Sequence, residues 1–337
     1  MLRIVMIGTG FMAGVHAKAI LSLGHRIALV VGHSLPAAKA FAQEYGIDEY
    51  SDSLSDEMLA AADCVHICTP PGSHADIIRR CLAHAVPVLC EKPLCFSARE
   101  ADELQLLAEK TGIVTAVGFN FRFFPAVETL REKLSGNHIH MVRAHYEQEF
   151  QMLPGPWSWR FMDPYRALTE IGTHCFDLIE FISRQDITDA VAMPYTLHPQ
   201  RMVDRNLQKA PVDGIGNRTV TNEDACAIAA RLSGGGICSI FLSEVSPGKT
   251  NDLTLSFTTD ENTFCWSAEH PASVLTGSRG EGVSCRTDAF SGGYPDTAKS
   301  LIAAFYKAIS TGVRDERLAD IRDGARIVRL IETMTMK

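Results

Sequence analysis

The stretch Gly8–Gly14, GTGFMAG, decides the fold, because it joins an apolar run to a helical pattern through closely spaced glycines. Gly8, Gly10 and Ala13 match the spacing G-x-G-x-x-G/A, directly after RIVMIG and at the start of a predicted helix. In such a turn the first glycine permits the bend, the second lets a pyrophosphate approach the main chain, and the small third residue lets the helix pack on the sheet. The helix N-terminus adds unpaired N–H groups and partial positive charge. The motif therefore predicts a dinucleotide site.

Strand and helix patterns alternate through residues 1–121, which is typical of a parallel sheet covered by helices. This rhythm predicts a doubly wound Rossmann domain of the α/β class, with ligands at the carboxyl ends of its strands. The expected strands are RIVMIG, RIALVVG, CVHICTP, VPVLCEK and IVTAVGF, and the expected helices are Met12–Leu23, Pro36–Tyr45, Ser55–Ala61, Ser73–His84 and Ser97–Lys110.

After Phe121 the rhythm changes, and residues 122–337 are expected to form a second, α+β domain. A helix at Pro125–Leu134 precedes the strand HMVRAHYEQEF, and TEIGTHCFDLIEFI predicts another helix. CAIAARLSGGGICSIFLSEVS and LTLSFTTDENTFCWSA predict antiparallel hairpins, and residues 203–218 a long loop. The expected sheet is open and mainly antiparallel. It would bind substrate on one face and pair with another subunit on the other, as a homodimer or homotetramer.

The composition argues against nucleic acid binding, a membrane span and a metal site. The chain has 337 residues, enough for two cores, and its net charge of −8 argues against binding a nucleic acid backbone. The sequence begins directly with a strand pattern, and its apolar runs are shorter than the ~20 residues of a membrane span, so we expect a cytoplasmic protein. The ten cysteines form no CxxC pair, and neither Cys64/Cys68 nor His138/His140 has a second pair, so no metal is expected.

The end of the second strand, VVGHS, bears on the choice of dinucleotide. Many NAD-binding domains place an acid here to hold the ribose 2′-hydroxyl, but this chain has Gly32, His33 and Ser34 and no acid before Glu44. Without a carboxylate, NAD loses a hydrogen bond and a 2′-phosphate meets no repulsion. Ser34 can donate to such a phosphate, while His33 and Lys39 add positive charge. The pattern favours NADP over NAD, with a loop that accepts both as the alternative.

The third strand ends in CTPPGSH, where Thr69 and Pro70 would form a wall beside the cofactor. His74, in the first turn of the next helix, is either a cofactor contact or a structural residue.

The fourth strand ends in CEKP, which places Glu91 and Lys92 directly after the apolar run VPVLC. A solvated surface pair fits poorly with that run. A lysine at a strand's carboxyl end faces the crevice, where it can share a proton with an alcohol or donate one to a carbonyl. Pro93 restricts the backbone beside it. Glu91 is then a counter-charge for Lys92 or a brace behind it.

With GTGFMAG, CTPPGSH and CEKP, the chain resembles the Gfo/Idh/MocA family, which includes glucose–fructose oxidoreductase and inositol dehydrogenase. The resemblance implies that Lys92 reaches the substrate hydroxyl beside the nicotinamide and that the Lys92–Pro93 bond is cis. Further matches extend over nearly the whole length: GFNFRFFP (118–125), WSWR (157–160), EIGTHCFD (170–177) and RDGARIVRLIETM (322–334).

On the predicted second-domain helix, Glu170, His174 and Asp177 fall at i, i+4 and i+7, along one stripe. A buried core histidine is one interpretation. The family pattern D-x-G-x-H falls on Glu170, Gly172 and His174, which implies that His174 is the general base and that Gly172 brings the helix close to ligand or cofactor. Glu170 replaces the usual Asp, and PYRAL replaces a glycine run, so the pocket wall differs. Arg166 in that run either selects a charged group or forms a surface salt bridge.

The resemblance and the residues together predict an NAD(P)-dependent dehydrogenase that moves hydride between nicotinamide and a secondary alcohol of a sugar, inositol or related polyol. The alternatives are a non-catalytic NAD(P)-binding regulatory protein of the same fold and a reductase of a non-sugar substrate. The expected catalytic residues are Lys92, His174 and Glu170. The expected cofactor contacts are Gly8, Thr9, Gly10, Phe11, Met12, Gly32, His33, Ser34, Thr69, Pro70, His74, Glu91 and Lys92, and the expected substrate contacts are Lys92, Asn120, Arg122, Trp159, Arg160, Glu170 and His174.

Overall fold

The computed structural model of the chain describes residues 2–152, 157–203, 216–287 and 292–336. The chain divides into two units, of which the first is Met1–Phe123 with Gly292–Arg329 and the second is Phe124–Ser291 with Leu330–Lys337. The expected single division after residue 121 therefore differs from the observed one. The break lies two residues later, and a C-terminal segment returns to the first unit.

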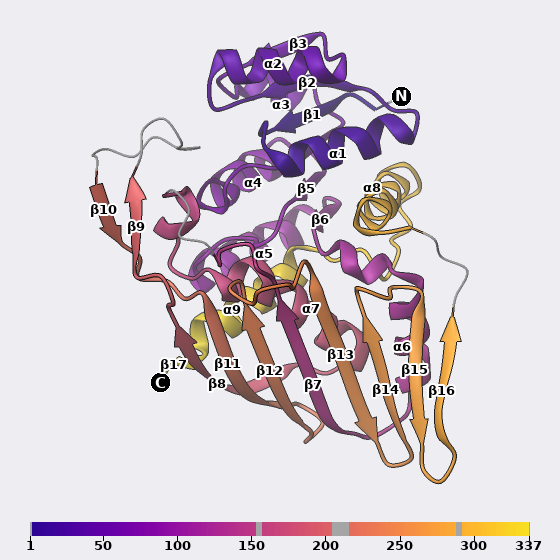
Figure 1. Cartoon of the computed structure of the whole chain (residues 1–337). Coiled ribbons are helices and arrows are strands. Elements are labelled where there is room, and N and C mark those ends of the chain that lie inside the picture. Colours follow the sequence, from indigo (N-terminus) through magenta and orange to yellow (C-terminus); the bar gives the residue numbers. More distant parts are fainter. Residues whose placement is uncertain (1, 153–156, 204–215, 288–291, 337) are drawn as a thin grey trace. The chain divides into compact units, whose positions relative to one another are not determined.

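Six parallel strands form the sheet of the first unit, in the order β3-β2-β1-β4-β5-β6 (Figure 1). This is the doubly wound order, and its direction reverses between β1 and β4, where ligands bind in such sheets. All residues of β1, β4, β5 and β6 are buried, as expected for strands covered by helices on both faces. The strands are β1 (Ile4–Ile7), β2 (Ile27–Val31), β3 (Glu49–Ser51), β4 (Cys64–Ile67), β5 (Val88–Cys90) and β6 (Thr115–Val117).

The five expected helices of the first unit are confirmed to within two residues at each end. The exposed strand β3 was not among the expected strands, and neither was α8, which packs along α1 and joins its apolar core through Leu301 and Phe305. This packing is why residues 292–329 belong to the first unit. The helices are α1 (Phe11–Ser22), α2 (Leu35–Tyr45), α3 (Asp56–Ala60), η1 (Pro71–Ser73), α4 (His74–Ala83), α5 (Ala98–Thr111), η2 (Asn120–Phe123), α8 (Tyr294–Thr311) and α9 (Ile321–Thr333), the last of which crosses into the second unit.

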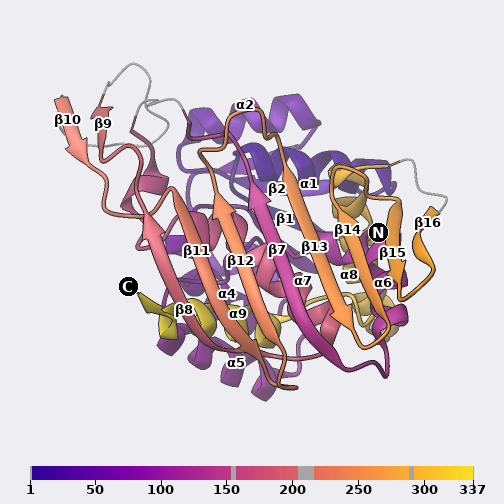
Figure 2. The ribbon, with the colours of Figure 1, turned by 60° about the horizontal axis from the view of Figure 1, so that its bottom comes forward.

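The second unit contains a nine-stranded sheet in the order β16-β15-β14-β13-β7-β12-β11-β8-β17. Its pairs are antiparallel except β7–β12 and β8–β17, so the expected mainly antiparallel sheet is confirmed. Helices α6 (Pro125–Leu134) and α7 (Thr173–Ser183) cover one face (Figure 2). The strands are β7 (Ile139–Glu147), β8 (Ile187–Tyr195), β11 (Ala225–Leu232), β12 (Ile237–Ser243), β13 (Asp252–Thr259), β14 (Asn262–Ser267), β15 (Ser273–Ser278), β16 (Gly282–Thr287) and β17 (Thr335–Met336).

Both predicted hairpins are present, as β11–β12 and β13–β14. The ends of the expected loop over residues 203–218 belong instead to the paired strands β9 (Gln200–Val203) and β10 (Gly216–Thr219). Residues 204–215 of that loop lie outside the described residues.

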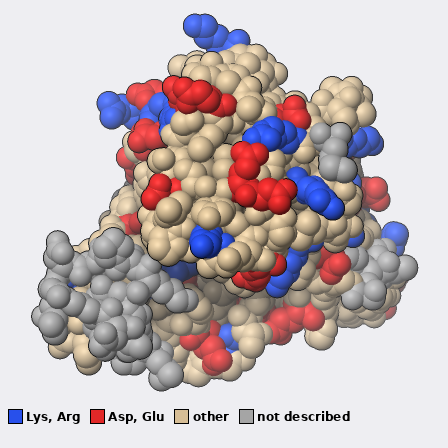
Figure 3. Space-filling model, turned by 90° about the horizontal axis from the view of Figure 1, so that it is seen from above, with Lys and Arg blue, Asp and Glu red and all other residues tan. Residues whose placement is uncertain are grey.

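Within the described residues, no helix combines the length and apolar character that crossing a membrane requires. Figure 3 shows one face of the molecule, on which Lys and Arg side chains are interspersed with Asp and Glu rather than gathered into a basic area.

The turn after β1 allows a test of the fold. Gly8 has φ +114°, and a Cβ there would lie 2.5 Å from the carbonyl oxygen of Cys68. Gly112, after α5, also has positive φ (+64°), but no heavy atom of the described residues lies within 4 Å of its Cβ position. We expect Gly112→Ala to lower the free energy of unfolding by about 1 kcal/mol through backbone strain alone. Gly8→Ala should cost at least about 1 kcal/mol more, because β1 and β4 must also separate. Urea unfolding of both variants measures the difference, and equal losses would contradict the close approach.

Candidate functional site

The glycine turn after β1 has the geometry that a phosphate group requires. Gly8 donates its N–H to Val31 O at 2.8 Å, which ties the turn to β2. Gly10 is the N-cap of α1, and no heavy atom of the described residues lies within 4 Å of where its Cβ would be. Because glycine has no side chain to cap the helix, the first N–H groups of α1 remain available to an anion. The buried Ala13 packs against the sheet as predicted.

The end of β2 carries the residues that were expected to choose the dinucleotide. Gly32 is closely packed, since a Cβ there would lie 3.0 Å from Ala38 and 3.1 Å from Thr9. Ser34 is the N-cap of α2, and its hydroxyl accepts the N–H of Ala37 at 3.4 Å. The hydroxyl hydrogen can therefore still be donated outward, and His33 beside it is exposed.

The ends of β4 and β5 are joined by His74. Its Nδ1 lies 2.9 Å from Pro93 O, and its Nε2 lies 2.9 Å from Thr69 O. The ring is fully buried, and burial lowers the pKa of His74 although both carbonyl contacts oppose this. Both ring nitrogens of His74 thus contact main-chain oxygens. His74 is therefore the structural residue that was one of its two expected roles, and the expected direct contact with a cofactor is corrected. The Lys92–Pro93 peptide bond is cis, as the resemblance implied.

Glu91 and Lys92 differ in environment. Glu91 is 6% exposed, and its Oε1 lies 3.1 Å from His16 Nε2. The carboxylate also lies against the next strand end, because a Cβ at Gly118 would be 2.6 Å from Oε1. Lys92 is partly exposed at the carboxyl end of β5. Glu91 is therefore a brace within the first unit, which was one of the two expected roles.

Two expected substrate contacts are buried in the first unit. Arg122 is 3% exposed and pairs with Asp323 of α9, with 3.3 Å between Nη1 and Oδ2. Asn120 donates from Nδ2 to Thr297 Oγ1 of α8 at 2.7 Å. Both side chains thus tie η2 to the C-terminal segment of this unit, and their contact with substrate stays a prediction. The adjacent GFNFRFFP motif gave no sign of these partners, which come from distant parts of the chain.

In the second unit, the predicted helix over 169–182 begins as a π-helix, η4 (Leu168–Gly172), and continues as α7. A π-turn has i→i+5 hydrogen bonds, so the expected α-helical stripe does not continue through Glu170. A Cβ at Gly172 would lie 2.8 Å from Leu242 Cδ1, so this glycine allows close packing on β12 rather than on a ligand. His174 and Asp177 are buried in α7, 4% and 1% exposed.

Three expected substrate contacts do come together. Arg160 Nε lies 3.2 Å from Glu170 Oε1, and its guanidinium carbon lies 4.4 Å from the centre of the Trp159 ring. Trp159 and Arg160 lie on η3 (Trp159–Met162). Asp163, which sequence reasoning missed, lies beside this group. Its burial, and then the charge of Glu170, raise the pKa of Asp163 to about 7.

The loop that carries this group is held by three consecutive residues, Asn222, Glu223 and Asp224, which the sequence analysis also missed. Asn222 donates to Arg160 O at 2.8 Å and Asp163 O at 3.0 Å. Oε1 of Glu223 accepts the N–H groups of Arg166 and Leu168, both at 2.9 Å, and so caps the start of η4. Asp224 Oδ2 accepts N–H groups of Leu197 and His198 at 2.6 and 3.0 Å. The sequence feature that could have indicated these three residues is the polar run TNED, directly before a strand in which apolar residues alternate with others.

Arg166 is neither a surface residue nor a selector of charged substrates, and both expected roles are corrected. It is 0% exposed and pairs with Asp224 and, at 3.2 Å, with Glu244. Arg166 and Arg201 each place their guanidinium carbon 4.9 Å from the ring centre of Phe161. Burial raises the pKa of Glu244 to about 8 despite the opposing charge of Arg166.

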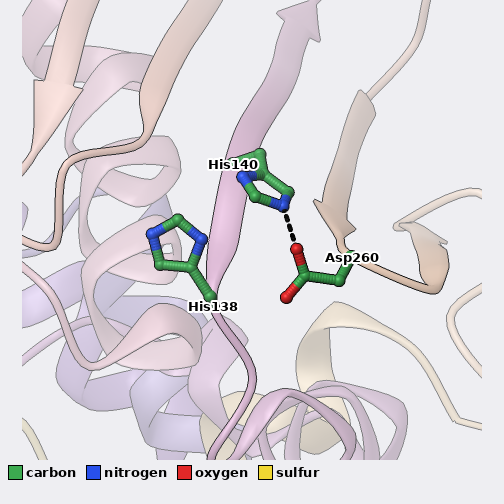
Figure 4. Close-up of side chains that lie close together, drawn as sticks. All are labelled: His138, His140 and Asp260. Atoms are coloured by element: carbon green, nitrogen blue, oxygen red, sulfur yellow. Dashed lines mark hydrogen bonds and ion pairs between the residues drawn. The ribbon is translucent and has the colours of Figure 1, made fainter.

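One surface group resembles a metal site (Figure 4). His138, His140 and Asp260 each offer a ligand atom, and these atoms lie within 4.8 Å of one another. All three side chains are exposed, and His140 Nε2 lies 2.6 Å from Asp260 Oδ1. We interpret the group as a surface hydrogen bond between His140 and Asp260 with a neighbouring histidine. Asp260 is thus a third polar residue beside His138 and His140, and the sequence did not indicate it.

The predicted chemistry is therefore divided between the units. The first carries the glycine turn and Lys92, and the second carries Arg160, Glu170 and His174. The arrangement of the first fits a dinucleotide, because an uncapped helix start with room at Gly10 lies on the sheet edge that also bears Lys92. The convergence of Lys92 and His174 on one oxygen stays a prediction.

Comparisons with known proteins find dehydrogenases among the similar chains. Glucose-6-phosphate 3-dehydrogenase of Bacillus subtilis (strain 168) is 24% identical over 200 residues, 57% of each chain. Levoglucosan dehydrogenase of Pseudarthrobacter phenanthrenivorans is 24% identical over 296 residues, 80% of this chain and 74% of that one. The chain thus matches little more than half the length of the first of these relatives. A solved structure of levoglucosan dehydrogenase in complex with NADH has a TM-score of 0.88 at 20% identity, covering 99% of this chain and 95% of that one, which shows a shared fold.

Family models match both parts of the chain. The model described as an oxidoreductase family with an NAD-binding Rossmann fold matches residues 2–119, and the model of the GFO/IDH/MocA C-terminal domain matches residues 128–264. Since the two matches follow one another along the chain, as the two domains of that family do, the protein belongs to the GFO/IDH/MocA oxidoreductase family.

Proposed function

We propose that the protein is an NAD(P)-dependent dehydrogenase that oxidises a secondary alcohol of a sugar, inositol or related polyol, or catalyses the reverse reduction. The observation that carries the proposal is the position of Lys92, at the carboxyl end of β5 in the sheet whose β1 ends in the glycine turn. A lysine at that edge stands where the reactive end of a dinucleotide lies in doubly wound folds. The names of the relatives, dehydrogenases of glucose 6-phosphate and levoglucosan, support the substrate class.

In the proposed reaction the alcohol carbon loses hydride and its hydroxyl loses a proton, so that a carbonyl forms. A bound nicotinamide supplies the hydride acceptor. Lys92 donates a hydrogen bond to the substrate oxygen, and His174 takes the proton as general base. Glu170 orients the imidazole and, through its pair with Arg160, directs a guanidinium towards other substrate oxygens. Binding both reactants in one crevice supplies much of the remaining rate enhancement.

We also propose a cytoplasmic homodimer or homotetramer that assembles through the sheet of the second unit. Support comes from the face of that sheet opposite α6 and α7, where large apolar side chains are exposed. Among them Ile237 is 52%, Phe241 44% and Leu275 44% exposed. Apolar side chains that share one open sheet face favour burial against a second copy.

Gly10→Ala tests the dinucleotide site without disturbing the fold. The added Cβ meets open space in the protein, so the free energy of unfolding should change by less than about 1 kcal/mol. The same Cβ would occupy the position of the pyrophosphate, and we expect at least a tenfold rise in the Kd of the preferred dinucleotide. Fluorescence titration with NADH and NADPH measures this. Unchanged affinity would place the cofactor elsewhere.

Lys92→Ala tests the proposed reaction. Wild type and variant are assayed with a panel of sugars, sugar phosphates and inositols, using both oxidised cofactors. Loss of general acid–base assistance should lower kcat about 100-fold or more, while the Kd of the dinucleotide changes less than threefold. Lys110→Ala, at an exposed position on α5, is the matched control and should behave as wild type. If the wild type binds the dinucleotide but turns over nothing in the panel, the non-catalytic alternative holds. Retained turnover in Lys92→Ala would remove this residue from the mechanism.

The choice of cofactor has its own test. We expect a lower Kd for NADPH than for NADH, because Ser34 and His33 meet a 2′-phosphate without repulsion. Ser34→Asp should reverse the ratio, since it introduces the carboxylate that holds a ribose 2′-hydroxyl. Ser55, which caps α3 in the same way, supplies the control Ser55→Asp with an unchanged ratio. Tighter NADH binding by the wild type would contradict the preference.

A further inference from the structure

A line of polar side chains runs through the core of the first unit. Glu91 Oε1 lies 3.1 Å from His16 Nε2, His16 Nδ1 lies 3.0 Å from His66 Nδ1, and His66 Nε2 lies 2.9 Å from the hydroxyl of Tyr306. The thiol of Cys68 lies 3.5 Å from His16 Nδ1. All five side chains are buried, and the two imidazoles are 2% and 0% exposed. The proposed reaction has no use for His16, His66 or Tyr306, so their presence requires an explanation.

The contacts and the charges together indicate which ring nitrogens of the line carry a proton. Burial alone would lower the pKa of His16, but Cys68 and Glu91 outweigh it and raise that pKa to about 10. His16 is therefore an imidazolium at neutral pH, and it donates from Nε2 to Glu91 and from Nδ1 to His66. His66 must accept at Nδ1 and donate from Nε2 to Tyr306. Its neutral form agrees with this, because burial and the charge of His16 hold the pKa of His66 well below its usual value. Burial raises the pKa of the Cys68 thiol, and the charge of His16 opposes this.

The charged end of this line lies next to the segments that carry the proposed reaction. His16 stands on α1, which begins at the glycine turn. Cys68 precedes Thr69 at the end of β4, and Glu91 precedes Lys92 at the end of β5. A buried ion pair is a poor source of stability compared with apolar packing, because both charges must leave water. Its better attested use is to specify one arrangement of the groups that it joins.

The Glu91 carboxylate has little room to move. His16 holds Oε1 on one side, and the main chain at Gly118 closes the other, since a Cβ there would be 2.6 Å away. The main-chain N–H of Glu91 donates to Ile67 O at 2.9 Å, which fixes the same residue to β4. Both the backbone and the side chain of Glu91 are therefore held, and the next residue starts from a defined direction.

We infer that His16 is a positioning residue for the reaction: its imidazolium, paired with Glu91, fixes the strand end from which Lys92 reaches the substrate oxygen. The inference rests on the proposed function for its catalytic consequence only. The link from α1 through Glu91 to the environment of Lys92 can be measured without any substrate.

The test compares His16→Gln, Glu91→Gln and the double variant with wild type. Each single variant breaks the pair and leaves one polar group buried without its charged partner. We expect kcat on the best substrate of the panel to fall at least tenfold, while the Kd of the dinucleotide changes less than threefold. The double variant should be no slower than the worse single variant, because the two residues act as a unit. Tyr306→Phe is the matched control, since it removes a hydrogen bond from the far end of the line and should keep kcat within twofold.

A substrate-independent measurement accompanies the kinetics. After reductive ¹³C-methylation, the methyl signal of Lys92 is identified by its absence in Lys92→Arg. This signal should shift in His16→Gln and Glu91→Gln but not in Tyr306→Phe. Gly118→Ala keeps both charges and displaces the carboxylate, so it should shift the same signal if a charge-removing variant fails to fold.

The contribution of His16 to the free energy of unfolding should decrease as pH rises. A histidine whose pKa is raised from 6.5 to about 10 by folding contributes stability that is complete below pH 6.5 and is lost as pH rises through 10. The facing groups are Glu91, Cys68 and His66, with Tyr306 beyond His66. The difference in unfolding free energy between wild type and His16→Gln should therefore shrink from pH 6 to pH 10.

The outcomes separate the two proposals. If the Lys92 signal is the same in wild type, His16→Gln and Glu91→Gln, the positioning role is overturned whatever the kinetics show. It is also overturned if Tyr306→Phe loses as much turnover as His16→Gln, because then any damage to this core slows the reaction. If the signal shifts as expected but the wild type turns over nothing in the panel, the proposed function falls and the link to Lys92 stands.

Discussion

The close approach of Gly8 to the carbonyl group of Cys68 is the constraint on which the first unit depends. It brings the ends of β1 and β4 together at the point where the strand order reverses. Only a residue without a side chain permits this approach, and the positive φ of Gly8 excludes most others for a second reason. With β1 and β4 in contact, α1 starts above the sheet edge with open N–H groups, and Thr69 and Lys92 fall on the same edge. A dinucleotide site follows from one glycine and the parallel order of the strands.

In the second unit the expected substrate contacts lie on short irregular helices rather than at strand ends. Trp159 and Arg160 lie on a 3₁₀ turn and Glu170 lies on a π-turn. Such short elements leave backbone groups at their ends that their own hydrogen bonds do not pair. Side chains supply the missing partners. Asn222 binds two carbonyl groups of this segment, and Glu223 binds two of its N–H groups. The π-turn is thus stabilised from outside, and its Glu170 carboxylate lies 3.2 Å from Arg160 Nε.

Much of this could be predicted from the sequence, and the successes share a cause. The parallel strands, their helices, the hairpins and the glycine turn are specified by residues close together in the chain, through periodicity and turn chemistry. Gly10 and Ser34 stand at the helix starts that local patterns predicted, for this reason. The helix α8 was missed although its start, Gly-Tyr-Pro-Asp, and the Gly312 that follows it are recognisable signals.

The errors have the opposite cause. Arg166 looks like a surface residue, and one of the residues that bury it, Glu244, lies far away in the chain. Gly172 was assigned to a ligand because a helical glycine suggests close approach, but the neighbour is Leu242 of a strand seventy residues later. The partner of Glu91 was out of reach in the same way, since His16 lies on another element of the sheet unit. Buried charge is specified by tertiary structure, and no local pattern reports it.

Buried charge is also what the two units have in common. Beside Lys92 the first unit buries Glu91 with His16, and close to Glu170 in the chain the second buries Arg166 with Asp224 and Glu244. Apolar side chains would fill either space with less desolvation, but they pack without direction and tolerate small rearrangements. An ion pair holds its members at one distance and one angle, and it weakens when either member loses its charge. Where the neighbouring side chain must meet a single oxygen atom, a defined direction is worth more than added stability. On this view the acid of CEKP faces inward so that the lysine beside it can face the substrate.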